Sequence, residues 1–199
     1  GRSESVLNHT GMRDIVYFDL ETQKSFSAVG GAKNKAKMGV SVAVTYSTKT
    51  DQYCVYGENQ MDALVEQLVK ADLVVGWNHI QFDYPVLQGY TIYDLEAQTM
   101  NLDMMLDIEQ EEKLGFRLKL DSAAKVSLGM GKTADGLDAL RWWNEYKKTG
   151  DKSFIMKIAE YCCFDVKVTK CVHEYGLEHG VIRYEDKAGN PAEVEVDWS

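Results

Sequence analysis

The apolar segment Asp14–Glu21 (DIVYFDLE) is the feature that most restricts the fold of this chain. Its β-branched and aromatic residues predict a strand. Alternate residues of a strand point to the same face, so Asp19 and Glu21 project together. An exposed acidic pair on an edge strand is the alternative, and the apolar Val16 and Phe18 argue against it because they indicate a central strand. Two neighbouring carboxylates repel each other unless a cation lies between them.

The remaining pattern of strands and helices predicts an α/β fold with a mixed sheet. Strands are expected at 38–46, 52–56, 73–77 and 100–106, and helices at 61–71, 83–89, 122–128, 137–147 and 153–178. The first three strands form an antiparallel meander, and the last helix could break near Lys157. Alternating residues in 181–198 predict a terminal hairpin. We therefore expect an N-terminal extension (1–13), one main α/β domain (14–180) and a hairpin (181–199).

The formal net charge of −9 argues against bulk attraction to nucleic acid, but not against a site that holds cations between carboxylates. Phosphate contacts would have to come from local basic groups, for which the candidates are Lys33, Lys35, Lys37, Lys147, Lys148 and Lys152. No segment is long and apolar enough to span a membrane. The four cysteines lack zinc-finger spacing, which indicates reduced thiols and a cytoplasmic location.

Two further acids lie in places that admit more than one interpretation. Asp83 stands where a strand leads into a helix, the usual ligand position of an α/β fold, but it could equally cap the helix that Pro85 begins. Asp165 follows Tyr161 by four residues, so both side chains share one helical face. Considered alone, Asp165 is better explained as a surface acid with Tyr161 packed in the core.

Taken together, the three patterns are far more specific. A D-x-E strand, an N-x-x-x-F-D loop (78–83) and a Y-x-x-x-D helix (161–165) follow one another along the chain. Over residues 14–178 this order resembles the DEDD superfamily of 3′–5′ exonucleases, which have a ribonuclease H-like fold. Tyr161 indicates the tyrosine type, since Glu160 occupies the position of the histidine in the other branch. Residues 120–125 with Gly129 resemble the polymerase-B-like (YprB-like) exonuclease group.

The resemblance implies a two-metal site for Mg²⁺ or Mn²⁺, the ions that carboxylate oxygens prefer. Asp19 would bridge both ions, Glu21 and Asp165 would complete one site, and Asp83 would serve mainly the other. Tyr161 would orient the attacking water by hydrogen bonding, because a phenol with a pKa near 10 is a poor base at neutral pH.

The expected substrate is a single-stranded 3′ end, with DNA favoured over RNA. Asn78 and Phe82 would contact the terminal nucleotide, although core packing is the stronger alternative for Phe82. Thr22 follows the strand and would touch the 3′ end. A helicase or polymerase would be a fitting partner. The alternatives are an endonuclease of the same fold and a catalytically silent module that binds nucleic acid or docks on a partner.

Overall fold

The computed structural model describes residues 13–112, 114–131 and 134–199, so the expected N-terminal extension lies almost wholly outside the described residues. The strands are β1 (Ile15–Thr22), β2 (Val40–Ser47), β3 (Gln52–Gly57), β4 (Leu73–Gly76), β5 (Asn101–Asp103), β6 (Val181–Glu185) and β7 (Pro191–Glu195). The α-helices are α2 (Met61–Lys70), α3 (Tyr84–Leu87), α4 (Leu95–Gln98), α5 (Met104–Glu112), α6 (Leu120–Leu128), α7 (Gly136–Thr149) and α8 (Ser153–His179). Shorter turns are η1 (Ser27–Val29), η2 (Ala32–Lys37), η3 (Glu58–Gln60) and the π-helical η4 (His79–Asp83).

The main sheet has five strands in the order β3-β2-β1-β4-β5, with β1 at its centre. β1 pairs antiparallel with β2, and β2 pairs antiparallel with β3. On the other side, β1 pairs parallel with β4, and β4 pairs parallel with β5. The predicted mixed sheet with an antiparallel meander is therefore confirmed, and so is the central position of β1.

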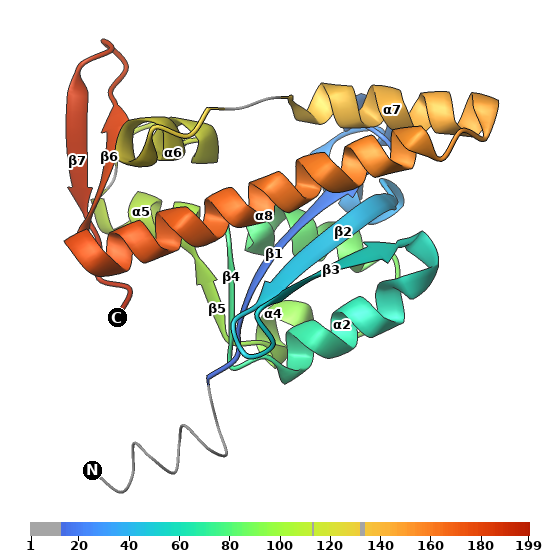
Figure 1. Cartoon of the computed structure of the whole chain (residues 1–199), viewed down its shortest axis with the longest axis horizontal. Coiled ribbons are helices and arrows are strands. Elements are labelled where there is room, and N and C mark those ends of the chain that lie inside the picture. Colours follow the sequence, from blue (N-terminus) through green and yellow to red (C-terminus); the bar gives the residue numbers. More distant parts are fainter. Residues whose placement is uncertain (1–12, 113, 132–133) are drawn as a thin grey trace, which may run out of the picture.

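Each face of the sheet is covered by helices. Because side chains alternate along β1, successive residues of this strand face opposite helix layers. Val16 and Phe18 pack in a core cluster with Leu64 of α2, whereas Tyr17 packs in a second cluster with Ile158 of α8. Asp19 and Glu21 share the parity of Tyr17, so they point toward α8. Figure 1 shows α8 crossing the sheet with α7 alongside its N-terminal half and the hairpin near its C-terminal end.

Three predicted elements differ from the structure. The strand expected at 100–106 ends at Asp103, because the Asp103 carboxylate accepts a hydrogen bond from the Leu106 N–H and starts α5. The helix expected from Asp83 begins earlier, with the π-helical turn at His79. The long helix has no break near Lys157 and runs from Ser153 to His179. The structure also contains α4, whose first turn is capped by the Asp94 side chain.

The predicted C-terminal hairpin is present, with β6 and β7 paired antiparallel. The residues that follow β7 pack against α5 and α8. The indole of Trp198 is buried and donates a hydrogen bond to Asp107 Oδ2 at 2.7 Å. The Trp198 ring also lies against Gly176 of α8, where an added Cβ would come within 2.4 Å of it. A glycine is therefore required at this point of α8 for the tail to pack.

All four cysteines are free thiols, as the sequence predicted. Within the described parts of the chain, no helix combines the length and the apolar character needed to cross a bilayer.

Candidate active site

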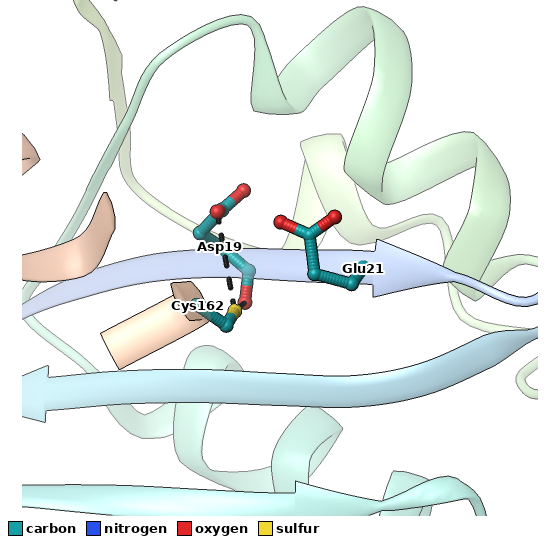
Figure 2. A group of neighbouring side chains, drawn as sticks. All are labelled: Asp19, Glu21 and Cys162. Atoms are coloured by element: carbon teal, nitrogen blue, oxygen red, sulfur yellow. Dashed lines mark hydrogen bonds between the residues drawn. The ribbon is translucent and has the colours of Figure 1, made fainter. Parts of the chain in front are cut away.

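The acidic pair of β1 lies beside a cysteine of α8. Ligand atoms of Asp19, Glu21 and Cys162 all lie within 4.8 Å of one another, and Figure 2 shows the two carboxylates on the same side of the strand. The Cys162 thiol is fully buried and donates to the Asp19 carbonyl oxygen at 3.5 Å. Burial and the negative charge of Asp19 raise the pKa of this thiol, so it keeps its proton.

Asp83, at the end of η4, is bonded to the same strand between Asp19 and Glu21. Its side chain is 3% exposed, and its Oδ1 accepts a hydrogen bond from the Leu20 N–H at 3.2 Å. The Asp83 side chain does not cap α3, so the helix-cap interpretation is not supported. Burial raises the pKa of Asp83 to about 8, although the Leu20 N–H opposes the shift.

A second buried carboxylate, Asp103, holds the turn that carries Asp83. Asp103 Oδ1 accepts from the Asn78 N–H at 2.8 Å, and its Oδ2 accepts from the Ile80 N–H at 3.1 Å. Asn78 adopts a left-handed conformation with φ of 63°, which bends the chain out of β4 into η4. π-Helical turns of this kind are frequent at functional sites.

Helix α8 supplies Tyr161 and Asp165 on one face, one turn apart. Tyr161 is 6% exposed and packs in the core cluster of α8. Burial raises the pKa of its phenol, and the charges of Asp165, Glu21 and Asp19 raise it further. Tyr161 is thus a core residue and also a neighbour of the acids. Packing in the core and a place beside the carboxylates, the two interpretations of Tyr161 made from the sequence, are therefore compatible.

The four predicted carboxylates form one electrostatic cluster. Burial raises the pKa of Asp19 well above its usual range, and the charges of Glu21, Asp83 and Asp165 each add to the shift. Within the described residues, no lysine, arginine or histidine forms an ion pair with Asp19 or Asp83. Buried acids in mutual repulsion are the donor set that a hard divalent cation neutralises.

The residues predicted to contact substrate are Thr22 and Phe82, which adjoin Glu21 and Asp83 in the sequence, and Asn78, which lines a cavity with Asp165. The Thr22 hydroxyl donates to the Lys24 carbonyl at 3.0 Å. Phe82 packs partly in the core, as its alternative interpretation held, and meets the ring of Phe26 edge-on with centroids 5.8 Å apart. Asn78 Oδ1 is buried and has no hydrogen-bond partner among the described residues. An orphaned acceptor of this kind favours a ligand that donates a hydrogen bond.

A cavity of about 440 Å³ lies between α8, which contributes Asp165, and the segment that precedes α6. Apolar and charged side chains both line it, among them Trp77, Asn78, Arg117, Lys119 and Phe164. None of Cys162, Asp103 or Arg117 was identified as a site residue from the sequence. The available signal for Asp103 was an acid inside an otherwise apolar predicted strand, whereas nothing in the sequence distinguishes Cys162 or Arg117.

Known proteins resemble this chain at two levels, in solved structures and in a family sequence model. The zinc-bound E. coli ExoI–ssDNA complex superimposes with a TM-score of 0.47 at 13% identity, covering 84% of this chain and 41% of that one. A further exonuclease I structure gives a TM-score of 0.48 at 12% identity, with the same coverages. The chain thus spans less than half the length of these structures. No curated protein sequence matches it. A sequence model of the RNase H superfamily matches residues 16–175, and the chain belongs to that superfamily.

Proposed function

We propose that this protein is a metal-dependent 3′–5′ exonuclease of the tyrosine type that removes nucleotides from the 3′ end of DNA or RNA. The observation that carries the proposal is the convergence of Asp19, Glu21, Asp83 and Asp165 from three separate elements, with Tyr161 beside them. Membership of the RNase H superfamily supports a nuclease. In the reaction, water attacks phosphorus, the bond to the 3′ oxygen breaks, and a nucleoside 5′-monophosphate leaves.

The four carboxylates would hold two divalent cations, Mg²⁺ or Mn²⁺. When bound, such a pair activates the attacking water and stabilises the leaving 3′ oxygen. The donor set fits these ions because it is rich in oxygen and negatively charged. Cys162 retains its proton and donates to the Asp19 carbonyl, so its role here is to hold the strand rather than to ligate.

Tyr161 is suited to orient the attacking water. Its raised pKa keeps the phenol protonated at neutral pH, so it acts as a hydrogen-bond partner and not as a base. Its burial fixes the ring in one place. A water held by Tyr161 would lie beside Asp165, one turn along the same helix face.

Asn78, Phe82 and Thr22 are proposed to contact the terminal nucleotide. Asn78 is the best supported, because its unpartnered Oδ1 is buried at the wall of the cavity next to Asp165. It can accept a hydrogen bond from a base or from the sugar hydroxyl. Phe82 forms an edge-on ring pair with Phe26. Phe26 is 43% exposed, so its ring is available for stacking on a base.

Substitution of the acids tests the proposal most simply. Asp19→Ala or Asp165→Asn should abolish cleavage of a labelled oligonucleotide while circular dichroism and Tm stay close to wild type. Asp62→Asn, an exposed acid of α2, is the matched control and should cleave normally. Full activity of Asp19→Ala would overturn the assignment. Internal fragments in place of mononucleotides would identify an endonuclease, and the absence of cleavage with intact binding would identify a silent module.

A further inference from the structure

The loop that joins β1 to β2 carries a concentrated positive charge in an otherwise acidic protein. Residues 23–39 contain four lysines and no aspartate or glutamate, whereas the whole chain has a net charge of −9. The loop begins two residues after Glu21 and contains η1 and η2. The loop therefore leaves β1 directly after the acidic pair.

This loop is packed onto the turn that bears Asp83. Lys35 Nζ donates to the Gln81 carbonyl oxygen at 2.6 Å. The next residue, Ala36, lies against Gly89, where an added Cβ would come 2.2 Å from the Ala36 carbonyl oxygen. The position of Lys35 is thus fixed by backbone contacts as well as by its own hydrogen bond.

A second cation reaches the same residue from a distant part of the chain. Arg117 lies between α5 and α6, and its Nη2 donates to Gln81 Oε1 at 3.3 Å. Arg117 and Lys119 also line the 440 Å³ cavity together with Asn78 and Asp165. Gln81, two residues before Asp83, is therefore flanked by Lys35 and Arg117.

These cations are not neutralised by acids in the described part of the chain. Neither Lys35 nor Arg117 forms an ion pair with a carboxylate there, whereas Lys70, Lys148 and Lys170 each pair with a glutamate. In a protein with an excess of acids, two unpaired cations beside a carboxylate cluster favour an anionic ligand that approaches the site. Arginine and lysine are the side chains that bind phosphate oxygens.

We propose that Lys35 and Arg117 form a phosphate grip around Gln81 that holds the backbone of a single-stranded substrate, upstream of the bond that is cut. This inference rests on the proposed exonuclease function and specifies its substrate. The cavity has the volume of a small-molecule site, and its lining includes the aromatic residues Trp77 and Phe164, a residue type on which bases stack. The cavity accommodates an unstacked terminal nucleotide, and Lys35 and Arg117 bind the phosphates on the 5′ side of that nucleotide.

The test compares a short and a long substrate in the same variants. The short substrate is the p-nitrophenyl ester of thymidine 5′-phosphate, which has no upstream phosphate. The long substrates are 12-residue oligothymidylate and oligouridylate, the DNA and RNA arms. The variants are Lys35→Gln, Arg117→Gln and the double substitution.

The matched control is Lys49→Gln with Lys70→Gln, which removes the same charge at the opposite end of the sheet. There the Thr48 N–H donates to the Ile15 carbonyl and the Asp72 N–H donates to the Asp14 carbonyl, at the start of β1. This control should match wild type on every substrate.

The expected result is a fall in the ratio of kcat/KM for the long substrate to that for the short one. Each cation removed should lower this ratio about fivefold at 0.1 M salt and reduce the slope of log kcat/KM against log salt by about 0.7. The two losses should multiply in the double variant. The DNA and RNA arms should respond alike, because the grip contacts phosphates.

Other outcomes separate the grip from the exonuclease proposal. If wild type hydrolyses both substrates and the double variant keeps the wild-type ratio and slope, the grip is wrong and the exonuclease proposal stands. If the variants lose both substrates equally, Lys35 and Arg117 act by positioning Asp83, which also overturns the grip. If polyglutamate competes as well as an uncleavable phosphorothioate strand, the surface binds an acidic protein instead. If wild type cleaves neither substrate with Mg²⁺ or Mn²⁺, the exonuclease proposal itself fails.

Discussion

Replacing Asp103 with asparagine tests whether the turn that carries Asp83 is held by one distant carboxylate. Asp103 is 5% exposed and accepts three backbone hydrogen bonds, from Asn78, Ile80 and Leu106. Asparagine keeps one acceptor oxygen and places an NH₂ group where the other was. At least one buried N–H then loses its partner, which costs about 2 kcal/mol of folding free energy.

Two assays follow the consequence of this change. For a chain of this length, about 2 kcal/mol lowers Tm by about 4–8 °C in a thermal melt. Loosening of η4 should also displace Asp83, so that cleavage falls about 10- to 100-fold and half-maximal activity needs more Mn²⁺. Asp62→Asn on α2 again controls for the lost charge. Wild-type melting and wild-type cleavage by Asp103→Asn would refute the argument that this carboxylate positions the turn.

Three further predictions concern chemistry, pH and packing. Tyr161→Phe should slow single-turnover cleavage about tenfold or more without lowering Tm, and an unchanged rate would remove its water-orienting role. Because burial raises the pKa of Asp83 to about 8 from the usual 3.8, the folded metal-free protein binds more protons than the unfolded chain. Its stability should therefore fall as pH rises from about 4 to about 8, and Mn²⁺ should raise Tm more at the upper end of this range. Equal shifts would contradict the raised pKa of Asp83. Gly176→Ala should cost about 1–3 kcal/mol in chemical denaturation, since its Cβ would lie 2.4 Å from the Trp198 ring, and unchanged stability would show that the tail is not fastened there.

The parts of the site that depend on local periodicity could be predicted from the sequence. The alternation in β1 placed Asp19 and Glu21 on one face, and the structure has them on the α8 side of a central strand. The four-residue spacing placed Tyr161 and Asp165 on one face of a helix that is present at almost the predicted bounds. These relations are fixed by the repeat of the element itself and need no knowledge of tertiary structure.

The parts that depend on distant contacts could not be predicted. Asp103 holds Asn78 and Ile80 across 25 and 23 residues of sequence, and this long-range bonding places the π-helical turn before Asp83. The apolar run that includes Met104 and Met105 fits a strand or a buried helix equally well, so the start of α5 was missed. The flanking of Gln81 by Lys35 and Arg117 likewise joins three segments that no local pattern connects.

The most direct test of the account is the product pattern from a single-stranded oligonucleotide labelled at either its 5′ or its 3′ end. With Mn²⁺ or Mg²⁺, the 5′-labelled strand should shorten one nucleotide at a time, and the 3′ label should appear at once as a mononucleotide. Asp19→Ala and a chelator should each abolish both signals. Release of the 5′ label as a mononucleotide, internal fragments, or cleavage that persists without divalent cations would contradict a metal-dependent 3′–5′ exonuclease built on these carboxylates.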